Sequence, residues 1–294
     1  MALKKKIIEI LAELSSIYSS LGDEYRALAY SKAIMSLRNN TKKGIGSSIQ
    51  AKINEITKTG KLQLLEDLKK NPIFQEQQEL LKIHGITSNF IKKYNVKSIE
   101  ELENKVEKGL IKLTNAQRLG LEYHEELKKK IPRSQMKAIG DVIINRVKTI
   151  PNVISAELVG SYRRGAELSK DIDILVVSNN PNISVEVLKK IKKVVKGTFT
   201  SGSRKFSGIV DIYDQERHID IMYAHPNEYA TSLLAFTGSA GFNRLLRLKA
   251  IEMGMKLNEK GLYKGNKKIS TKTEKEIFKK LKLKYIKPEL RSLK

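Results

Sequence analysis

Residues 1–130 place apolar side chains at helical spacing, every three or four positions. One run extends from Ile7 to Leu21 and stops at Gly22, which predicts a helix ended by a glycine. A second helix is predicted where Tyr30 to Leu37 repeat the spacing. A third follows a turn with Gly44 and Gly46, and its apolar stripe is Ile49, Ile53 and Ile56. We expect a small helical module that contains the turn and helix of a helix-hairpin-helix.

A weaker copy of this turn and helix runs from His84 to Tyr94, with Gly85 in the turn. Backbone N–H groups at such a helix start can bind phosphate without reading base sequence. An isolated Gly-x-Gly before a helix is more often a plain turn. The two hairpins alone therefore leave both interpretations open.

The pattern changes to short β-rich runs after a break at Ile131-Pro132-Arg133. Strands are predicted at residues 156–159, 171–177, 209–213 and 218–222. A helix over residues 242–253 and a lysine-dense final segment with apolar Ile277, Phe278 and Leu281 follow. This order predicts helices, then a sheet packed by helices, then helices again, which is an α+β protein.

The charge of the chain indicates its partner. It has 294 residues and a formal net charge of +24, from 56 Lys and Arg against 32 Asp and Glu. The excess lies at both ends, as expected of a protein that contacts a long polyanion. A merely lysine-rich surface is the alternative.

The residue types that are missing limit the chemistry. There is no cysteine, which excludes disulfides, thiolate nucleophiles and iron–sulfur sites. No apolar run is long enough to span a bilayer, and Glu9 and Glu13 interrupt the N-terminal run where a signal peptide would be apolar. We expect an intracellular, soluble protein whose metal, if any, is bound by oxygen or by one of four histidines.

Two aspartates alternate with isoleucines in Asp171-Ile172-Asp173-Ile174. Because strand side chains alternate between faces, Asp171 and Asp173 are expected on one side while the isoleucines enter the core. Neighbouring like charges favour a bound cation, and oxygen ligands favour Mg²⁺ or Mn²⁺. Asp220, on another apolar strand, is expected to complete a carboxylate set for two ions, as in nucleotidyl transfer.

A turn bracketed by Gly160 and Gly165 lies between a predicted strand and the aspartates. In this turn Ser161 offers a hydroxyl and Arg164 a guanidinium, both of which bind phosphate oxygens. An Asp-x-Asp alone is more often a solvated strand end. Together with the turn and Asp220, it predicts a phosphoryl- or nucleotidyl-transfer site.

These residues resemble the nucleotidyltransferase superfamily and, within it, family X of the DNA polymerases. The likeness covers nearly the whole chain and rests on motifs in the family's order: Gly44-Ile45-Gly46 with Lys52, Gln117-Arg118-Leu119-Gly120-Leu121, Ile131-Pro132-Arg133, Gly160–Gly165, Lys205-Phe206-x-Gly208, Phe236-Thr237-Gly238-Ser239 and Asn258-Glu259. The resemblance implies a multidomain α+β fold. Its parts would be a helical lyase domain with a helix-hairpin-helix (1–70), helical fingers with the second hairpin (71–132), a catalytic palm with a mixed sheet (133–226) and a helical thumb that binds the nascent base pair (227–294).

The resemblance also implies roles for single residues. Asp171, Asp173 and Asp220 would bind two Mg²⁺ ions, for which Mn²⁺ substitutes. Residues implied to hold the incoming dNTP are Ser161, Arg164, Lys170 through its backbone, Phe236, Gly238 and Asn243. Residues implied to contact DNA are Arg26, Tyr30, Gly44, Gly46, Lys52, Gly85, Lys205 and Arg247. Glu259 would tether the closed thumb, and the hairpins would bind a monovalent cation.

Lys52 resembles the Schiff-base lysine of the family's 5′-deoxyribose phosphate lyase, with Arg26 and Tyr30 in its pocket. The alternative is one more phosphate-binding lysine. Ser48 and Leu64 stand where the family pattern has lysines.

Three other positions depart from the family pattern. His218 and Met222 flank Asp220 where arginines are usual, so the hydrogen bonds that orient Asp220 are expected to differ. Ala235 stands where the gap-filling polymerases that the chain most resembles carry a tyrosine, whose ring is implied to crowd the 2′-carbon of the sugar. Weaker exclusion of ribonucleotides is therefore expected.

The resemblance implies a DNA-directed DNA polymerase that fills gaps in base excision repair, with 5′-deoxyribose phosphate removal. Its expected partners are gapped or nicked double-stranded DNA, dNTPs and a DNA ligase, and a monomer in the nucleus or cytoplasm, or in a host compartment for a virus, is expected. A template-independent terminal transferase is one alternative, but it usually has a long insertion before the palm and Gly-Trp at Ala235-Phe236. A catalytically silent DNA-binding scaffold is the other, against which the three aspartates argue.

Overall fold

The computed structural model of the chain describes residues 2–41 and 44–292. These residues form two compact units, of which the first ends at Glu122 and the second begins at Tyr123. The described part of the first unit is helical, and the second combines a five-stranded mixed sheet with helices. The α+β class predicted from the sequence is confirmed. The division into four domains stays a prediction.

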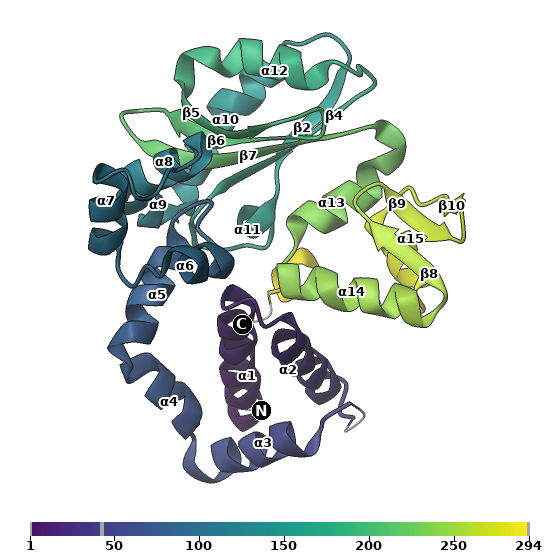
Figure 1. Ribbon diagram of the computed structural model, residues 1–294. Coiled ribbons are helices and arrows are strands. Elements are labelled where there is room, and N and C mark those ends of the chain that lie inside the picture. The colour runs from purple at the N-terminus through teal and green to yellow at the C-terminus, as the bar shows by residue number, and fades with distance from the viewer. Residues whose placement is uncertain (1, 42–43, 293–294) are drawn as a thin grey trace. The chain divides into compact units, whose positions relative to one another are not determined.

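The first unit contains eight described helices around two apolar cores (Figure 1). The first core holds Leu11, Ile34 and Ile56, and the second holds Leu80, Phe90 and Leu102. The helices are α1 (Ala2–Ser20), α2 (Glu24–Arg38), α3 (Ser47–Thr59), α4 (Gln63–Lys70), α5 (Pro72–Lys82), α6 (Ser88–Tyr94), α7 (Ile99–Glu107) and α8 (Asn115–Glu122).

Local sequence signals explain where these helices begin and end. Gly22 has a φ of +76°, which favours glycine and separates α1 from α2 as predicted. The side chain of Asp23 then accepts a hydrogen bond from the N–H of Arg26 and caps α2. In the second hairpin the Thr87 side chain caps α6, and Gln117 donates a hydrogen bond to the carbonyl of Gly85. The glycine turns are therefore fixed by packing and caps inside the first unit.

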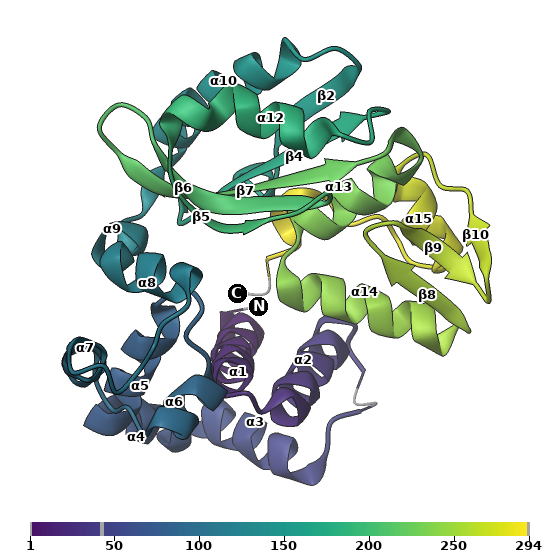
Figure 2. The same ribbon diagram turned by 45° about the horizontal axis from the view of Figure 1, so that its top comes forward.

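The second unit is built on a sheet with the strand order β2-β4-β7-β6-β5 (Figures 1 and 2). β4 and β7 are parallel, and the other neighbours are antiparallel. The strands are β2 (Val153–Leu158), β4 (Ile172–Ser178), β5 (Val195–Ser201), β6 (Lys205–Asp211) and β7 (Glu216–Ala224). A short pair, β1 (Ile131–Pro132) and β3 (Leu168–Ser169), lies beside it.

The two faces of this sheet are covered by different helices. α10 (Arg133–Lys148) and α12 (Ile183–Ile191) cover one face, where Ile172 and Ile174 enter the main core. α11 (Gly160–Arg163) and α13 (Tyr229–Thr237) lie on the other face, against Leu175 and Val177. Residues of odd number in β4 and of even number in β7 therefore share the α13 face, which matters for the aspartates.

The chain ends in a small subdomain of helices and three short strands. Its elements are α14 (Ala240–Glu252), β8 (Met255–Asn258), β9 (Gly261–Lys264), β10 (Lys267–Ile269) and α15 (Glu274–Lys280). The three-stranded sheet corrects the expectation of a purely helical end. These strands have only three or four residues each, which is too short for a period-two pattern to reveal them. The remaining elements are α9 (His124–Lys128) and the 3-10 turns η1 (Lys192–Val194), η2 (Pro226–Glu228) and η3 (Pro288–Leu290).

Candidate active site

Three aspartates meet on the α13 face of the sheet. Asp173 on β4 is the register partner of Asp220 on the parallel strand β7. Asp171 precedes β4 by one residue and has the same parity as Asp173. The structure therefore brings together the three carboxylates that the sequence predicted.

The crowding of these carboxylates changes their electrostatics. The pKa of Asp173 rises to about 7, first because the side chain is buried and then because Asp220 and Asp171 add negative charge. The ionised form of Asp173 is thus disfavoured in the protein alone. A cation placed among the three side chains would relieve both repulsions.

Two basic side chains contact the aspartates. His218 Nδ1 lies 2.9 Å from Asp171 Oδ1, and its Nε2 lies 2.9 Å from the hydroxyl of Ser207. Lys205 donates a hydrogen bond to Asp220 Oδ2 at 2.7 Å. Burial would lower the pKa of His218, but the hydrogen bond and charge of Asp171 outweigh burial and raise it. The family pattern assigns Lys205 to DNA binding, whereas in this structure Lys205 contacts the carboxylate of Asp220.

Among the described residues, no three His, Asp or Glu side chains are arranged as the ligands of one metal ion. The chemistry of the donors nevertheless fits Mg²⁺, because all three are carboxylate oxygens. In addition, Asp220 Oδ1 is buried and accepts no hydrogen bond from the described residues, although His218 Nε2 lies 3.5 Å away. Asp171, Asp173 and Asp220 are the residues that would hold the ions.

The turn after β2 is pressed against these aspartates. Gly160 has a φ of +53°, and a Cβ atom there would lie 1.8 Å from Asp173 Oδ2. Only glycine fits this position. The next residue, Ser161, donates a hydrogen bond to the hydroxyl of Ser169 at 2.7 Å. The glycine thus lets the backbone of the predicted phosphate-binding turn approach the carboxylates.

Other contacts hold the far side of this turn. Arg133 donates a hydrogen bond to the carbonyl of Tyr162 at 2.7 Å and stacks its guanidinium 4.0 Å from the Tyr162 ring. Arg164 donates to the carbonyl of Thr237 and, through Nε, to the hydroxyl of Ser292 at 3.3 Å. Burial lowers the pKa of Arg164 while the charge of Asp173 opposes it. Lys170 is exposed.

The predicted base-pair contacts lie on α13 and α14. Ala235, Asn243 and Arg247 line one narrow crevice, and Asn243 Nδ2 donates to the carbonyl of Ala235 at 2.5 Å. Phe236 is partly buried against the apolar cluster of the α13 face. Gly238 has a φ of +69°, and a Cβ there would lie 3.2 Å from Arg164 Nη1. The structure therefore brings Ala235, Asn243 and Arg247 together, and it places Gly238 next to Arg164.

Glu259 contributes contacts through its backbone. Its carbonyl accepts hydrogen bonds from Thr231 at 3.0 Å and from Ser232 at 2.8 Å, both on α13. These bonds fix the turn between β8 and β9 to α13. They involve the main chain, and the role of Glu259 as a tether of the closed thumb stays a prediction.

The first unit carries a separate cavity of about 610 Å³. Lys52 lies in its lining, and its ammonium donates to the hydroxyl of Ser48 at 3.0 Å and to the Ser48 carbonyl at 3.4 Å. Lys32 also lines the cavity and was not singled out from the sequence. The predicted residues gathered here are Arg26, Tyr30, Gly44, Gly46, Ser48, Lys52 and Leu64.

Aromatic contacts shape one wall of this cavity. The rings of Tyr18 and Tyr30 stack with centroids 5.7 Å apart, and the guanidinium of Arg26 lies 5.1 Å from the centre of the Tyr18 ring. Burial and the neighbouring Tyr18 raise the pKa of Tyr30, although Arg26 acts to lower it. Gly85, the glycine of the second hairpin, is not among the cavity residues.

Several contacts at the aspartate site were not predicted. These are the hydrogen bonds of Arg133 with Tyr162, of Ser161 with Ser169 and of His218 with Asp171. They depend on long-range packing, for which the sequence has no local signal. The short strand pair β1 and β3 brings Arg133 and Ser169 to the turn. Its only sequence sign is the Ile131-Pro132-Arg133 break.

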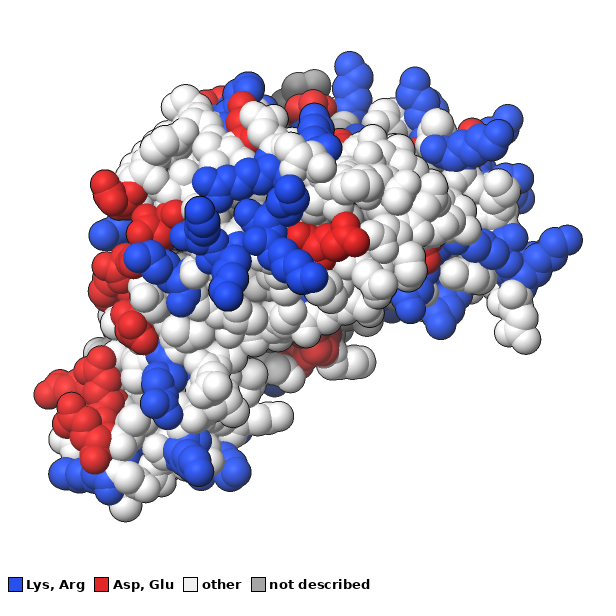
Figure 3. Space-filling view, turned by 90° about the horizontal axis from the view of Figure 1, so that it is seen from above, with Lys and Arg blue, Asp and Glu red and all other residues white. Residues whose placement is uncertain are grey.

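Positive charge is not limited to the candidate sites. Figure 3 shows Lys and Arg side chains gathered on the face seen from the side of α12. Exposed Lys189, Lys190, Lys192 and Lys193 belong to α12 and η1. This helix covers the sheet face opposite to the aspartates. Part of the net charge therefore reflects a lysine-rich surface.

None of the helices in the described part of the chain is long and apolar enough to cross a lipid bilayer.

Comparison with known proteins gives matches over most of the sequence. The family model of the DNA polymerase beta palm matches residues 130–227, and that of the DNA polymerase beta thumb matches residues 232–292. DNA polymerase lambda of Arabidopsis thaliana is 28% identical over 99% of this chain, and DNA polymerase lambda of Rattus norvegicus is 26% identical over 96%. DNA nucleotidylexotransferase of Gallus gallus is 25% identical over 83%. The chain spans 62%, 55% and 56% of the length of these three relatives.

Proposed function

This chain belongs to family X of the DNA polymerases, and from that membership we propose that it is a DNA-directed DNA polymerase. It fills short gaps in double-stranded DNA in base excision repair, by nucleotidyl transfer from dNTPs. The observation that carries the proposal is the register of Asp173 and Asp220, with the Gly160 turn directly against Asp173. A carboxylate set and a phosphate-binding turn in contact are what the transfer of a nucleotidyl group requires.

Each residue has a separate task in this proposal. Asp171, Asp173 and Asp220 hold Mg²⁺, which when bound neutralises the triphosphate and lowers the pKa of the primer 3′-hydroxyl. Ser161 and Arg164 bind and orient the β and γ phosphates, so that the primer oxygen and the pyrophosphate lie in line with the α-phosphorus. The protein contributes positioning and charge, and no covalent intermediate is needed.

Two neighbours prepare the aspartates for this role. Because a carboxylate only accepts hydrogen bonds, His218 donates through Nδ1 to Asp171, and Lys205 donates to Asp220. These contacts orient the side chains and offset part of their charge. His218 stands where the family pattern has an arginine, and its Nδ1 lies 2.9 Å from Asp171 Oδ1.

The test is primer extension on DNA with a one-nucleotide gap, with and without a 5′-phosphate. We expect addition of the single templated nucleotide, and faster addition when the 5′-phosphate is present. Extension of a single-stranded primer would instead favour a terminal transferase, as in the relative from Gallus gallus. Tight binding of gapped DNA without extension would favour a scaffold.

A second activity, 5′-deoxyribose phosphate lyase, is supported by the cavity of the first unit. Lys52, Arg26 and Tyr30 line one space with the turn of Gly44 and Gly46. In the proposed reaction the Lys52 amine attacks the C1′ aldehyde and forms an imine with loss of water. Loss of a C2′ proton then breaks the C3′–O bond and releases the 3′-phosphate with the downstream strand, and water hydrolyses the remaining imine to free Lys52. Arg26 supplies a cation for the 5′-phosphate.

A further inference from the structure

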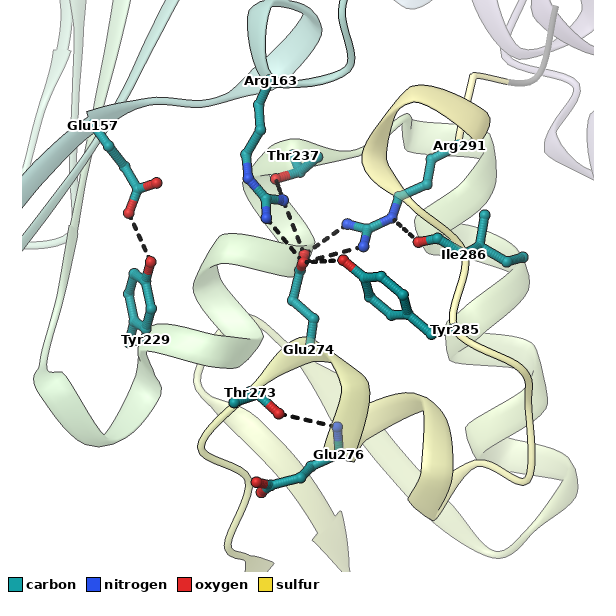
Figure 4. A network of polar contacts seen from close by, with 10 residues as sticks. All are labelled: Glu157, Arg163, Tyr229, Thr237, Thr273, Glu274, Glu276, Tyr285, Ile286 and Arg291. Atoms are coloured by element: carbon teal, nitrogen blue, oxygen red, sulfur yellow. Dashed lines mark hydrogen bonds and ion pairs between the residues drawn. The ribbon is translucent and has the colours of Figure 1, made fainter.

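A buried ionic cluster lies beside the proposed triphosphate site, with the carboxylate of Glu274 at its centre (Figure 4). Arg163 donates to Glu274 Oε1 at 3.1 Å and to Oε2 at 2.9 Å, and also to the hydroxyl of Thr237 at 2.7 Å. Arg291 approaches the same carboxylate with bonds of 2.6 and 3.1 Å. Tyr285 adds its hydroxyl at 3.3 Å. We name these five residues the Glu274 cluster.

The burial of this cluster is unusual for ionic groups. The side chain of Arg291 is fully buried and that of Glu274 is 6% exposed, whereas Arg163 is 22% exposed. Burial would raise the pKa of Glu274, but the hydrogen bonds of Arg291 and Arg163 outweigh it and lower the pKa. Such a buried pair is weak evidence of a gain in stability, since apolar side chains of the same volume often stabilise as well. The contribution of the buried pair therefore lies in the geometry that it imposes on the neighbouring segments.

The cluster joins segments that are distant in sequence. Arg163 belongs to α11, Thr237 ends α13, Glu274 begins α15, and Arg291 follows η3. The fork of each arginine fits the carboxylate in one orientation only, because both bonds must form together. The Glu274 carboxylate therefore fixes α11 relative to the ends of α13 and α15.

This fixation reaches Arg164, the next residue after Arg163. Arg164 donates to the carbonyl of Thr237, the same residue whose hydroxyl accepts from Arg163. Arg164 Nε also donates to Ser292, the neighbour of Arg291. The two arginines thus contact the same two segments, the end of α13 and residues 291–292. Neither of the two Arg164 bonds uses its Nη2.

We propose that Glu274 is a positioning residue for the triphosphate of the incoming nucleotide, which acts through Arg163 on the guanidinium of Arg164. Loss of the Glu274 carboxylate would free Arg163 and let α11 and Thr237 shift, so that Arg164 would no longer be aimed at the phosphates. The inference rests on the proposed function in that Arg164 binds the triphosphate.

The test uses Glu274→Gln, with Glu276→Gln as the matched control. Glu276 lies on the same helix, and its carboxylate accepts from the backbone N–H of Lys272 and points away from the cluster (Figure 4). Single-nucleotide insertion on gapped DNA gives kcat and KM for the dNTP, and equilibrium binding of a labelled dNTP gives Kd directly. We expect Glu274→Gln to raise KM and Kd about tenfold or more while the affinity for gapped DNA stays within about twofold. Glu276→Gln should leave all these values within about twofold.

Two further variants separate positioning from a general loss of structure. Arg163→Gln removes the link to α11 but leaves the buried Glu274 and Arg291 pair in place. This variant therefore keeps the test valid if Glu274→Gln unfolds. We expect Arg163→Gln to raise KM as Glu274→Gln does. Combined with Arg164→Ala, Glu274→Gln should add little further loss, because both act on one guanidinium. Additive losses, or unchanged KM and Kd in folded Glu274→Gln or Arg163→Gln, would overturn the inference.

The outcomes also separate this inference from the proposed function. A wild-type protein that binds dNTP but inserts none would refute the polymerase proposal, and the Kd of Glu274→Gln would still test the role of Glu274. A wild-type protein that binds no dNTP would refute both.

Discussion

The two candidate sites of this protein are built by different kinds of contact. The aspartate site depends on the pairing of β4 with β7, which places Asp173 opposite Asp220. The cavity that Lys52 lines in the first unit, here called the lysine cavity, is formed mainly by α2 and α3, which follow each other in the chain. The first site therefore requires the sheet to form in one register, whereas the second requires the packing of helices that are close together in the chain, from α1 to α4.

The electrostatics of the two sites also differ. Burial and two further carboxylates raise the pKa of Asp173 to about 7, so a cation bound among the aspartates would favour its ionised form. In the cavity, Lys52 is held by the neutral hydroxyl and carbonyl of Ser48. The comparison predicts two independent activities, one of which depends on a divalent metal and one of which does not.

The largest effect is expected for Asp220→Ala. This change removes a proposed metal ligand but no phosphate contact, so nucleotide addition should fall at least about a hundredfold, or about 2.7 kcal/mol of barrier. Primer extension and a DNA-binding titration on the same samples measure the two properties. Binding should stay nearly intact, and the borohydride-trapped lyase complex should be unaffected.

Asp211→Ala is the matched control for Asp220→Ala. Asp211 forms a similar contact with a lysine in the same sheet, 3.1 Å from Lys196. Its removal should leave nucleotide addition unchanged. If Asp220→Ala keeps more than a few per cent of wild-type synthesis, the increase in its activation free energy is about 1 kcal/mol smaller than expected. Such a result would remove Asp220 from the site.

The second prediction concerns the stability of the aspartate-containing unit in acid. Glu274→Gln leaves the buried Arg291 and the partly buried Arg163 without their carboxylate, which should cost about 2 kcal/mol of unfolding free energy at pH 7. The folded pKa of Glu274 is lowered, so the unfolded state binds more protons and this contribution is lost as the pH falls through the folded pKa. The difference between wild type and Glu274→Gln should therefore shrink below pH 4.5, the ordinary value for this carboxyl.

Urea unfolding at several pH values measures this difference. Glu276→Gln should show a small and nearly constant difference over the same range. A gap between wild type and Glu274→Gln that stays constant down to acid pH would mean that Glu274 does not titrate within the cluster.

Much of this architecture follows from local patterns in the sequence. The stripe Ile49, Ile53 and Ile56 predicted α3, and all three side chains are buried. The alternation at Asp171-Ile172-Asp173 predicted the strand and its two faces, because Ile172 is buried in the main core while Asp173 lies on the α13 face. The spacing of apolar residues is enough to predict such elements, because it depends only on which side of the element is buried.

Other features could not be predicted because they depend on contacts between distant segments. β5 contains lysine, glycine and threonines, and its pairing with β6 is interrupted by register shifts, so no apolar alternation marks it. Glu274 and Arg291 look like ordinary charges in a lysine-rich end. Only the packed structure reveals that they are buried against Arg163.

The third prediction tests the lysine cavity. Borohydride should trap a covalent complex between the wild-type protein and DNA with an incised abasic site, and Lys52→Ala should reduce the trapped fraction at least about tenfold, because it removes the proposed nucleophile. Metal chelation should not reduce trapping, and Lys52→Ala should leave nucleotide addition intact. These outcomes would establish that the two sites act independently.

Lys58→Ala is the control for Lys52→Ala, because Lys58 is exposed on the same helix and is not among the cavity residues. Undiminished trapping in Lys52→Ala would move the nucleophile elsewhere, with Lys32 as the first residue to test. Failure of the wild type to form any trapped complex would mean that Ser48 and Leu64 mark a lost activity.

The smallest effect is expected for Ala235, which lines the crevice beside Asn243 and Arg247. The pattern of the gap-filling family X polymerases has a tyrosine here, and we expect that without its ring a ribonucleotide meets a weaker steric barrier at the 2′-carbon. Ala235→Tyr should therefore raise discrimination against ribonucleotides about tenfold, or about 1.4 kcal/mol. The competing explanation is that the backbone excludes the 2′-hydroxyl by itself, since the Ala235 carbonyl is fixed by the hydrogen bond from Asn243. Single-turnover insertion of dCTP and CTP opposite guanine separates the two explanations, because an unchanged ratio in Ala235→Tyr would assign the exclusion to the backbone.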